Sequence, residues 1–295
     1  MKLVFLGTSS AFPTADRNHS ATFLDIGPEA FLFDCGENTQ RQLRIAGISP
    51  MKISKVFITH WHGDHVLGLP GLLQSFELNN KKGQVDIYGP EGTKERFHYL
   101  RKALGVQTSY KIEVHEAKAG KVFETEDYQI IAGKAIHTIP CLTFAYIEKE
   151  KVRLKKEVVE KLKLDGPIVA ELTKGKDIIL QGKTVKSKDA TYVKEGKKIS
   201  YVIDSAFDEK LIDFAKNSDV LVCEATFDKS LEKEANEKGH MSAKQAGKIA
   251  LKSKSKQLII THFSQRYNDT KQLLIEAQKE FKNTIAARDF LEVKI

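Results

Sequence analysis

The sequence predicts a layered α/β fold, in which strands alternate with amphipathic helices. Two observations predict it. Short apolar runs recur along the chain, and several of them end in a histidine, aspartate or glutamate. Segments with apolar residues three and four positions apart, which is the spacing of a helix face, lie between these runs. Because open α/β sheets gather their functional residues outside the carboxyl ends of the strands, the pattern predicts one cleft at a sheet edge.

The first half of the chain supplies the expected elements in order. Met1 leads directly into an apolar strand over 3–6, and a second strand over 31–33 ends at Asp34. A third apolar strand covers 56–58. Helical spacing is present in three segments of this half, which are 37–46, 66–78 and 93–104. The same alternation resumes after 199 and continues to the end of the chain.

A dense group of potential metal ligands follows the strand over 56–58. Within six positions the chain carries His60, His62, Asp64 and His65. In an extended segment the first two point to the same side, and Gly63 permits a tight turn before the others. Imidazoles with a carboxylate suit zinc and similar cations, whereas calcium and magnesium prefer oxygen ligands alone. This density favours a metal site over a histidine-rich surface turn.

Four residues of one segment do not complete two metal shells, and other strands offer further ligands in the same format. Asp204 follows the apolar run 201–203, Glu224 follows 221–223, and His262 follows 258–261. A single acid at a strand end is more often a helix cap or a turn former. The repetition of this pattern in a chain that also carries the histidine group favours convergence on one cleft.

Two further histidines have different surroundings. His137 lies in an apolar stretch, where a histidine is more often a hydrogen-bonded core residue than a ligand. His240 precedes Ser242 and Gln245, a capping-box pair that opens a helix, and this position suits proton transfer better than ligation. Two cations about 3.5 to 4 Å apart, with a free histidine beside them, suit the hydrolysis of phosphodiesters.

Composition limits the class of protein. The 295 residues are 41% hydrophobic, which fits one large globular domain or two small ones. No apolar stretch approaches the roughly 20 residues of a membrane span and no signal-peptide pattern follows Met1, so we expect a cytoplasmic protein without a membrane partner. Cys35, Cys141 and Cys223 form no CxxC pair and are expected to be reduced core residues.

Positive charge is concentrated in one segment. The chain has a net charge of +8, which favours an anionic partner such as nucleic acid but also fits a heat-adapted protein. Residues 148–198 contain 15 lysines and arginines against 9 acidic residues, a net +6, and interrupt the α/β pattern as an insertion. Within it we expect a helix over 151–164, a break at 166–167 and a hairpin from 172 to 183. A solvated lysine-rich face and a phosphate-binding arm remain equally open.

These features resemble the ribonuclease Z family of the metallo-β-lactamase superfamily over essentially the whole chain. The HxHxDH group alone indicates the superfamily. The resemblance also covers Leu6-Gly7-Thr8-Ser9-Ser10, His137 with Pro140, Asp204 and His262. The features that narrow it to the family are Asp34-Cys35-Gly36-Glu37 with Thr39-Gln40, Glu224-Ala225-Thr226-Phe227, His240 before a helix, and a basic insertion carrying Gly166-Pro167.

The resemblance implies a four-layer αββα sandwich over 1–295, with 148–198 as an inserted flexible arm. It implies a zinc-dependent endoribonuclease that removes the 3′ trailer from precursor tRNA and leaves a 3′ hydroxyl on the tRNA and a 5′ phosphate on the trailer. Two Zn²⁺ ions per subunit are implied, although Mn²⁺ or Fe²⁺ suit the same donors. Their ligands would be His60, His62 and His137 for one ion, Asp64, His65 and His262 for the other, and Asp204 as the bridge.

The resemblance also implies roles for individual residues. Asp64 is the candidate proton acceptor, and His240, oriented by Glu224, donates a proton to the leaving 3′ oxygen. The arm matches the family's tRNA-gripping element, which acts in a homodimer. Candidate tRNA contacts are Gly166, Pro167, Lys174 and Lys176 in the arm, and Arg17 in the loop 13–18, where this chain has Ala15 in place of the family's lysine.

Two other functions compete with this hypothesis. A small-molecule metallohydrolase, such as a thioesterase or lactonase, would use the same metal ligands, but a net +6 insertion has no obvious task on a small neutral substrate. A non-catalytic RNA-binding member of the superfamily would lose ligands, whereas this chain retains every candidate together with His240.

Overall fold

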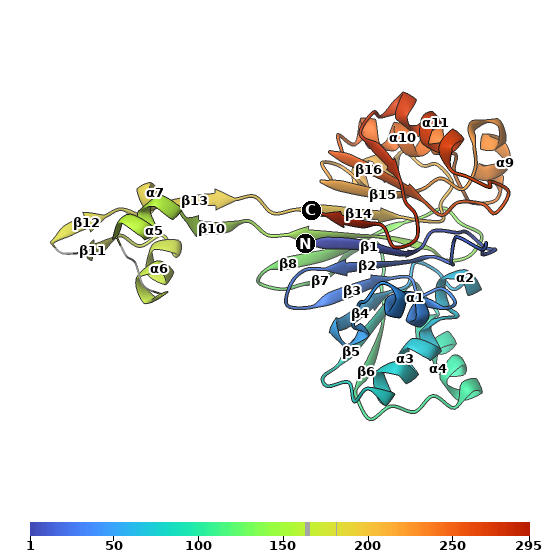
Figure 1. Ribbon diagram of the computed structural model, residues 1–295, viewed down its shortest axis with the longest axis horizontal. Coiled ribbons are helices and arrows are strands. Elements are labelled where there is room, and N and C mark those ends of the chain that lie inside the picture. The colour runs from blue at the N-terminus through green and yellow to red at the C-terminus, as the bar shows by residue number, and fades with distance from the viewer. Residues whose placement is uncertain (163–165, 181) are drawn as a thin grey trace.

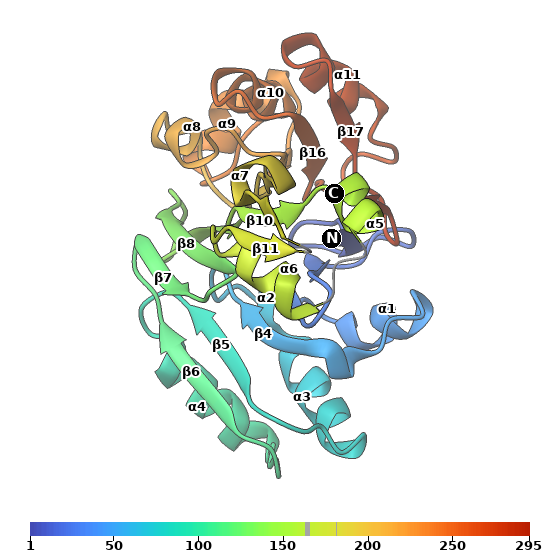
Figure 2. The same ribbon diagram turned by 90° about the vertical axis from the view of Figure 1, so that its left-hand side faces the viewer.

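The computed structural model describes residues 1–162, 166–180 and 182–295. Two seven-stranded sheets pack face to face, and helices cover the outer face of each. Viewed along the projecting arm, the two sets of helices lie on opposite sides of the paired sheets (Figure 2). The predicted four-layer αββα arrangement is therefore confirmed.

The first sheet has the strand order β18-β1-β2-β3-β4-β5-β6. Its strands are β1 (Lys2–Gly7), β2 (Ala21–Asp25), β3 (Ala30–Phe33), β4 (Ile53–Phe57), β5 (Val85–Gly89), β6 (Ile112–Glu116) and β18 (Glu292–Lys294). Pairing is parallel from β3 to β6 and antiparallel elsewhere. Its outer face carries α1 (Thr39–Ile45), η1 (Pro50–Lys52), α2 (Gly63–Val66), α3 (Leu69–Leu78) and α4 (Thr93–Leu104), so the three helices expected here are present.

The second sheet has the order β17-β16-β15-β14-β9-β8-β7, with parallel pairing from β14 to β17. Its strands are β7 (Gly120–Glu124), β8 (Tyr128–Lys134), β9 (Leu142–Glu148), β14 (Lys198–Val202), β15 (Val220–Glu224), β16 (Gln257–Thr261) and β17 (Thr284–Ala286). The helical segments of this half are α8 (Lys210–Phe214), η2 (Lys229–Leu231), α9 (Glu232–Glu237), α10 (Ala243–Lys252) and α11 (Lys271–Glu280).

Burial on both faces explains why the strands are apolar throughout. Along β1, Leu3 and Phe5 face the core between the sheets, whereas Val4 and Leu6 face the core beneath the helices. Successive side chains of a strand point to opposite faces, so a sheet covered on both sides needs apolar residues at every position. The expected reduced core cysteines, Cys35, Cys141 and Cys223, are all buried and free.

Residues between β9 and β14 form an arm that extends away from the sheets (Figure 1). Because β9 and β14 are antiparallel neighbours, the chain leaves and rejoins the second sheet at adjacent strands. The stalk is a two-stranded ribbon of β10 (Lys151–Leu154) and β13 (Thr191–Lys194). The tip consists of α5 (Lys156–Leu162), α6 (Gly166–Thr173), β11 (Ile178–Leu180), β12 (Lys183–Val185) and α7 (Ser187–Ala190).

The local pattern of the arm misled the sequence prediction in three places. The helix expected over 151–164 is wrong in its first part, since that part is strand β10, and residues 163 and 164 lie outside the described residues. The expected break at Gly166-Pro167 is the start of α6, where proline in the first turn is well tolerated. The hairpin begins at Ile178, because Leu172 still belongs to α6 and is fully buried.

No helix within the described residues is both long and apolar enough to span a bilayer.

Candidate active site

Strand ends and loops from both sheets bring the candidate ligands together at one end of the sandwich. The cluster after β4 comes from the first sheet. From the second sheet come the loop between β8 and β9, which carries His137, and the ends of β14 and β16, which are followed by Asp204 and His262. The structure thus places residues from four separate parts of the chain in one cleft.

Three polar residues at the strand ends adopt an uncommon backbone conformation. Asp34, Asp204 and His262 have φ angles of 57°, 54° and 59°. Few non-glycine residues occupy this left-handed region, although aspartate and histidine tolerate it best, and such strained residues cluster at functional sites. The turn takes the backbone out of the sheet while each side chain stays buried in the site.

A first group of possible ligand atoms belongs to His60, His62, His137 and Asp204, which all lie within 4.8 Å of one another. His62 Nδ1 is 3.0 Å from His60 Nε2 and 3.1 Å from His137 Nε2. Burial lowers the pKa of His60 well below its usual value, with nearby His65 adding to the effect, and burial also lowers the pKa of His62. Neutral imidazoles whose nitrogens converge are suited to binding a cation.

A second group shares Asp204 with the first and adds Asp64, His65 and His262, again within 4.8 Å. His262 Nε2 is 2.9 Å from Asp204 Oδ1, and His65 Nε2 is 3.3 Å from Asp64 Oδ2. Burial lowers the pKa of His262, but Asp204 and Asp64 outweigh it and raise the pKa to about 9. The buried carboxylates thus favour positive charge here, and a divalent cation provides it as well as a proton does.

Hydrogen bonds from outside the site fix the orientation of four imidazole rings. Each outward ring nitrogen has a partner: Thr59 Oγ1 at 3.1 Å for His60, Asp34 Oδ2 at 2.9 Å for His65, the Gly239 carbonyl at 2.9 Å for His137, and Thr226 Oγ1 at 3.0 Å for His262. This leaves the opposite nitrogen of each ring directed into the site, as in known metal centres.

Three buried atoms at the centre of the second group form no hydrogen bond of standard geometry among the described residues, although two of them, His262 Nε2 and Asp204 Oδ1, lie 2.9 Å apart. They are His65 Nε2, His262 Nε2 and Asp204 Oδ1. A buried polar atom without a well-formed hydrogen bond costs about 1 to 3 kcal/mol, and one cation among these three atoms would satisfy all of them together. The residues present therefore fit a divalent metal ion.

Asp34 has an orienting role that sequence reasoning missed. It was predicted as a ligand-type residue at a strand end, but its carboxylate accepts hydrogen bonds from the Thr59 backbone N–H at 2.8 Å and the Tyr201 hydroxyl at 3.3 Å, besides holding His65. It belongs to neither group of possible ligands. Its position directly after an apolar strand, like that of Asp204, was the available signal.

His240 and Glu224 lie beside the two groups. His240 Nδ1 is 3.4 Å from Glu224 Oε2, and the histidine side chain is 18% exposed. Burial lowers the pKa of His240, but Glu224 and Asp204 together raise it above the usual value. Glu224 is itself fixed by the backbone N–H groups of Ser205 and Met241. An imidazole thus stands at the cleft beside a buried carboxylate that favours its protonated form.

The cleft has a volume of about 390 Å³ and opens over both groups of possible ligands. His62, Asp64, His137, Asp204, His240 and His262 line it, together with Ala11, Gly63, Thr138 and Lys238. Lys238 is the basic member of this lining, and its ammonium group donates a hydrogen bond to Glu234 Oε1 at 2.6 Å.

None of the candidate tRNA contacts is among the residues that line this cleft. Arg17 is only 8% exposed and donates to the Tyr267 carbonyl at 2.7 Å, so it anchors its loop against the 264–267 turn and is not presented to a substrate. The four arm candidates are exposed, at the first residues of α6 for Gly166 and Pro167, and just after that helix for Lys174 and Lys176.

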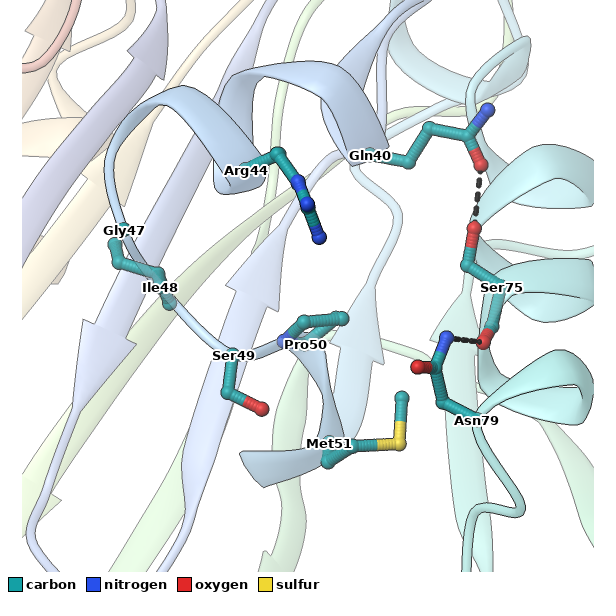
Figure 3. Close-up of a pocket in the computed structure, with 9 residues that line it drawn as sticks. All are labelled: Gln40, Arg44, Gly47, Ile48, Ser49, Pro50, Met51, Ser75 and Asn79. Atoms are coloured by element: carbon teal, nitrogen blue, oxygen red, sulfur yellow. Dashed lines mark hydrogen bonds between the residues drawn. The ribbon is translucent and has the colours of Figure 1, made fainter.

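A separate hollow of about 500 Å³ lies between α1 and α3 (Figure 3). Gln40 and Ser75 are hydrogen-bonded across it at 2.6 Å, and Arg44 faces it. It contains none of the candidate ligands, so we do not regard it as part of the active site.

Comparisons with known proteins agree with this description. A family model described as anti-Pycsar protein Apyc1 matches residues 1–282. A ribonuclease Z of Methanothermobacter thermautotrophicus is 37% identical over 297 residues, covering 100% of this chain and 97% of the relative. A ribonuclease Z of Archaeoglobus fulgidus is 36% identical over 300 residues, with the same coverage.

Solved structures show the same fold. The short form of human tRNase Z superimposes with a TM-score of 0.73 at 27% identity, covering 100% of this chain and 99% of that one. The metallo-β-lactamase-fold protein YhfI of Bacillus subtilis gives a TM-score of 0.72 at 20% identity, covering 99% and 98%, which supports the fold alone. The chain therefore has the metallo-β-lactamase fold and belongs to the ribonuclease Z family, as well as to the family that the Apyc1 model describes.

Proposed function

We propose that this protein is a zinc-dependent endoribonuclease that removes the 3′ trailer from precursor tRNA. The observation that carries the proposal is the pair of ligand groups joined at Asp204, with His240 and Glu224 beside them, in a chain whose full-length relatives are named ribonuclease Z. Five imidazoles among the seven donors favour zinc over magnesium or calcium, while Mn²⁺ and Fe²⁺ remain alternatives.

Each residue of the site has a separate role in the proposed reaction. Asp64, Asp204 and the five histidines would hold two divalent cations, whose charge would lower the pKa of water and offset the charge of the scissile phosphate. Asp64 accepts a proton from the attacking water, and His240 gives a proton to the leaving 3′ oxygen of the tRNA. Glu224 keeps His240 oriented and protonated. The products are a tRNA with a 3′ hydroxyl and a trailer with a 5′ phosphate.

The position of the arm supports action as a homodimer. β9 and β14 run between two ends of the sandwich: His137 and Asp204 lie at one end, and the arm joins the other (Figure 1). The seven residues of β9 separate these ends by about 20 Å. An arm that projects away from its own cleft is better placed to hold a tRNA whose trailer lies in the cleft of a second subunit.

The activity is tested by supplying three substrates to the purified protein. These are a trailer-bearing precursor tRNA, a thioester and a lactone, each with and without a chelator and beside a His65→Ala variant. We expect cleavage of the precursor at one position, loss of that cleavage with chelator, and its absence in the variant. Hydrolysis of the thioester or lactone without cleavage of the precursor would contradict the proposal and favour a small-molecule hydrolase.

Because the substrate is precursor tRNA, we also infer that the enzyme acts in the cytoplasm.

A further inference from the structure

A second hollow adjoins the metal cleft. It has a volume of about 610 Å³ and lies between the residues after β5, the turn joining β6 to β7, and the loop joining β8 to β9. His137 and Thr138 line both this hollow and the cleft. The two spaces are therefore neighbours at one pair of residues. We call the second hollow the side groove.

The side groove combines small apolar walls with free positive charge. Its walls include Ala117, Ala135, Pro140 and Leu142, and the lysines at 118 and 134 line it as well. Both lysines are exposed, and among the described residues neither forms an ion pair with a carboxylate. One acidic residue, Glu91, also lines the groove. Two lysines without carboxylate partners beside an open groove suit the phosphates of a nucleic-acid backbone.

The position of His240 indicates which part of the substrate lies in the side groove. His240 lines the cleft but not the groove. Under the proposed function, on which this inference rests, His240 protonates the 3′ oxygen that stays on the tRNA, so the tRNA lies on the His240 side. We propose that the side groove binds the first nucleotides of the 3′ trailer, with Lys118 and Lys134 contacting trailer phosphates.

Comparing precursors with trailers of different length distinguishes trailer binding by the side groove from a general effect of its charge. The test compares the wild-type protein with a K118E/K134E variant on three substrates: a precursor with a single-nucleotide trailer, the same precursor with a longer trailer, and bis(p-nitrophenyl) phosphate. We expect KM for the longer trailer to rise about tenfold, since charge reversal removes two phosphate contacts. The other two substrates should be cleaved at nearly the wild-type rate.

A matched control makes the same change of charge elsewhere. Lys279 and Lys282 are exposed near the end of α11 and line neither hollow. The K279E/K282E variant should treat both trailers as the wild type does. Equal loss on both trailers in K118E/K134E, or no loss on either, would overturn the inference while leaving the proposed function intact. Failure of the wild-type protein to cut either precursor would instead remove the proposed function and the inference with it.

Discussion

His240 sits within reach of both ligand groups yet is held by Glu224, which is completely buried. Substitution of His240 therefore distinguishes a proton donor, whose loss lowers kcat alone, from a metal ligand, whose loss lowers metal content. We predict that His240→Ala lowers kcat for precursor cleavage by roughly 10² to 10⁴, the usual contribution of general acid catalysis. Metal content, measured by atomic absorption, should stay at the wild-type value. A variant that has lost metal would show that His240 is a ligand.

Gly239 links the proton donor to the metal ligands. It has a φ of +76°, and its carbonyl accepts the hydrogen bond of His137 Nδ1. A Cβ at this position would lie 2.7 Å from His137 Nδ1 and 2.9 Å from its Cα. We predict that Gly239→Ala displaces His137 and lowers metal occupancy, measured by atomic absorption, besides costing about 1 kcal/mol or more of stability through backbone strain.

Gly83 provides the control for that substitution. Its φ of +82° is nearly the same, but a Cβ there meets nothing within 4 Å. Gly83→Ala should therefore show the strain in its thermal unfolding temperature without any loss of metal. Equal loss of metal in both variants would contradict the contact with His137 as the cause.

At the scale of elements, the sequence predicted the features that depend on residues close together in the chain. The cluster from His60 to His65 was recognisable because its members follow one strand within six positions. The hydrogen bond that fixes His65 was not, because its partner Asp34 is 31 residues away. Strand β10 was mistaken for helix for the same reason. Its pairing partner, Val193 opposite Val152, lies much later in the chain.

We expect that the arm can be removed without unfolding the sandwich. Where it joins the sheet, the backbone N–H of Glu148 donates to the Lys197 carbonyl at 2.8 Å, so the two ends are already paired. We predict that deleting residues 150–195, which leaves Lys149 joined to Gly196, lowers kcat/KM for precursor tRNA by at least tenfold. The reason is the loss of basic residues that contact phosphates far from the cut. Cleavage of bis(p-nitrophenyl) phosphate, measured in parallel, should remain near the wild-type rate. Equal losses on both substrates would show that the arm supports the active site and not tRNA binding.

At the scale of the whole molecule, the basic arm and the candidate active site lie at opposite ends of the second sheet. The basic arm leaves from the end of β9 at Glu148, while His137 and Asp204 lie at the other end of the second sheet. Within a single chain, the arm therefore projects away from the cleft and does not cover it. Two copies resolve this separation if the arm of each holds the tRNA that the other cuts.

This arrangement predicts complementation between two chains that are each impaired in precursor cleavage. One chain lacks residues 150–195, and the other carries His65→Ala with its arm intact. In a mixed dimer, the intact arm of the second chain holds the tRNA at the intact cleft of the first. We therefore expect the two chains, when refolded or expressed together, to cleave precursor tRNA faster than the sum of their separate rates, approaching half the wild-type activity per mixed dimer. Size-exclusion chromatography with light scattering should show the dimer. Strictly additive rates from a preparation that contains mixed dimers would mean that each arm serves its own cleft.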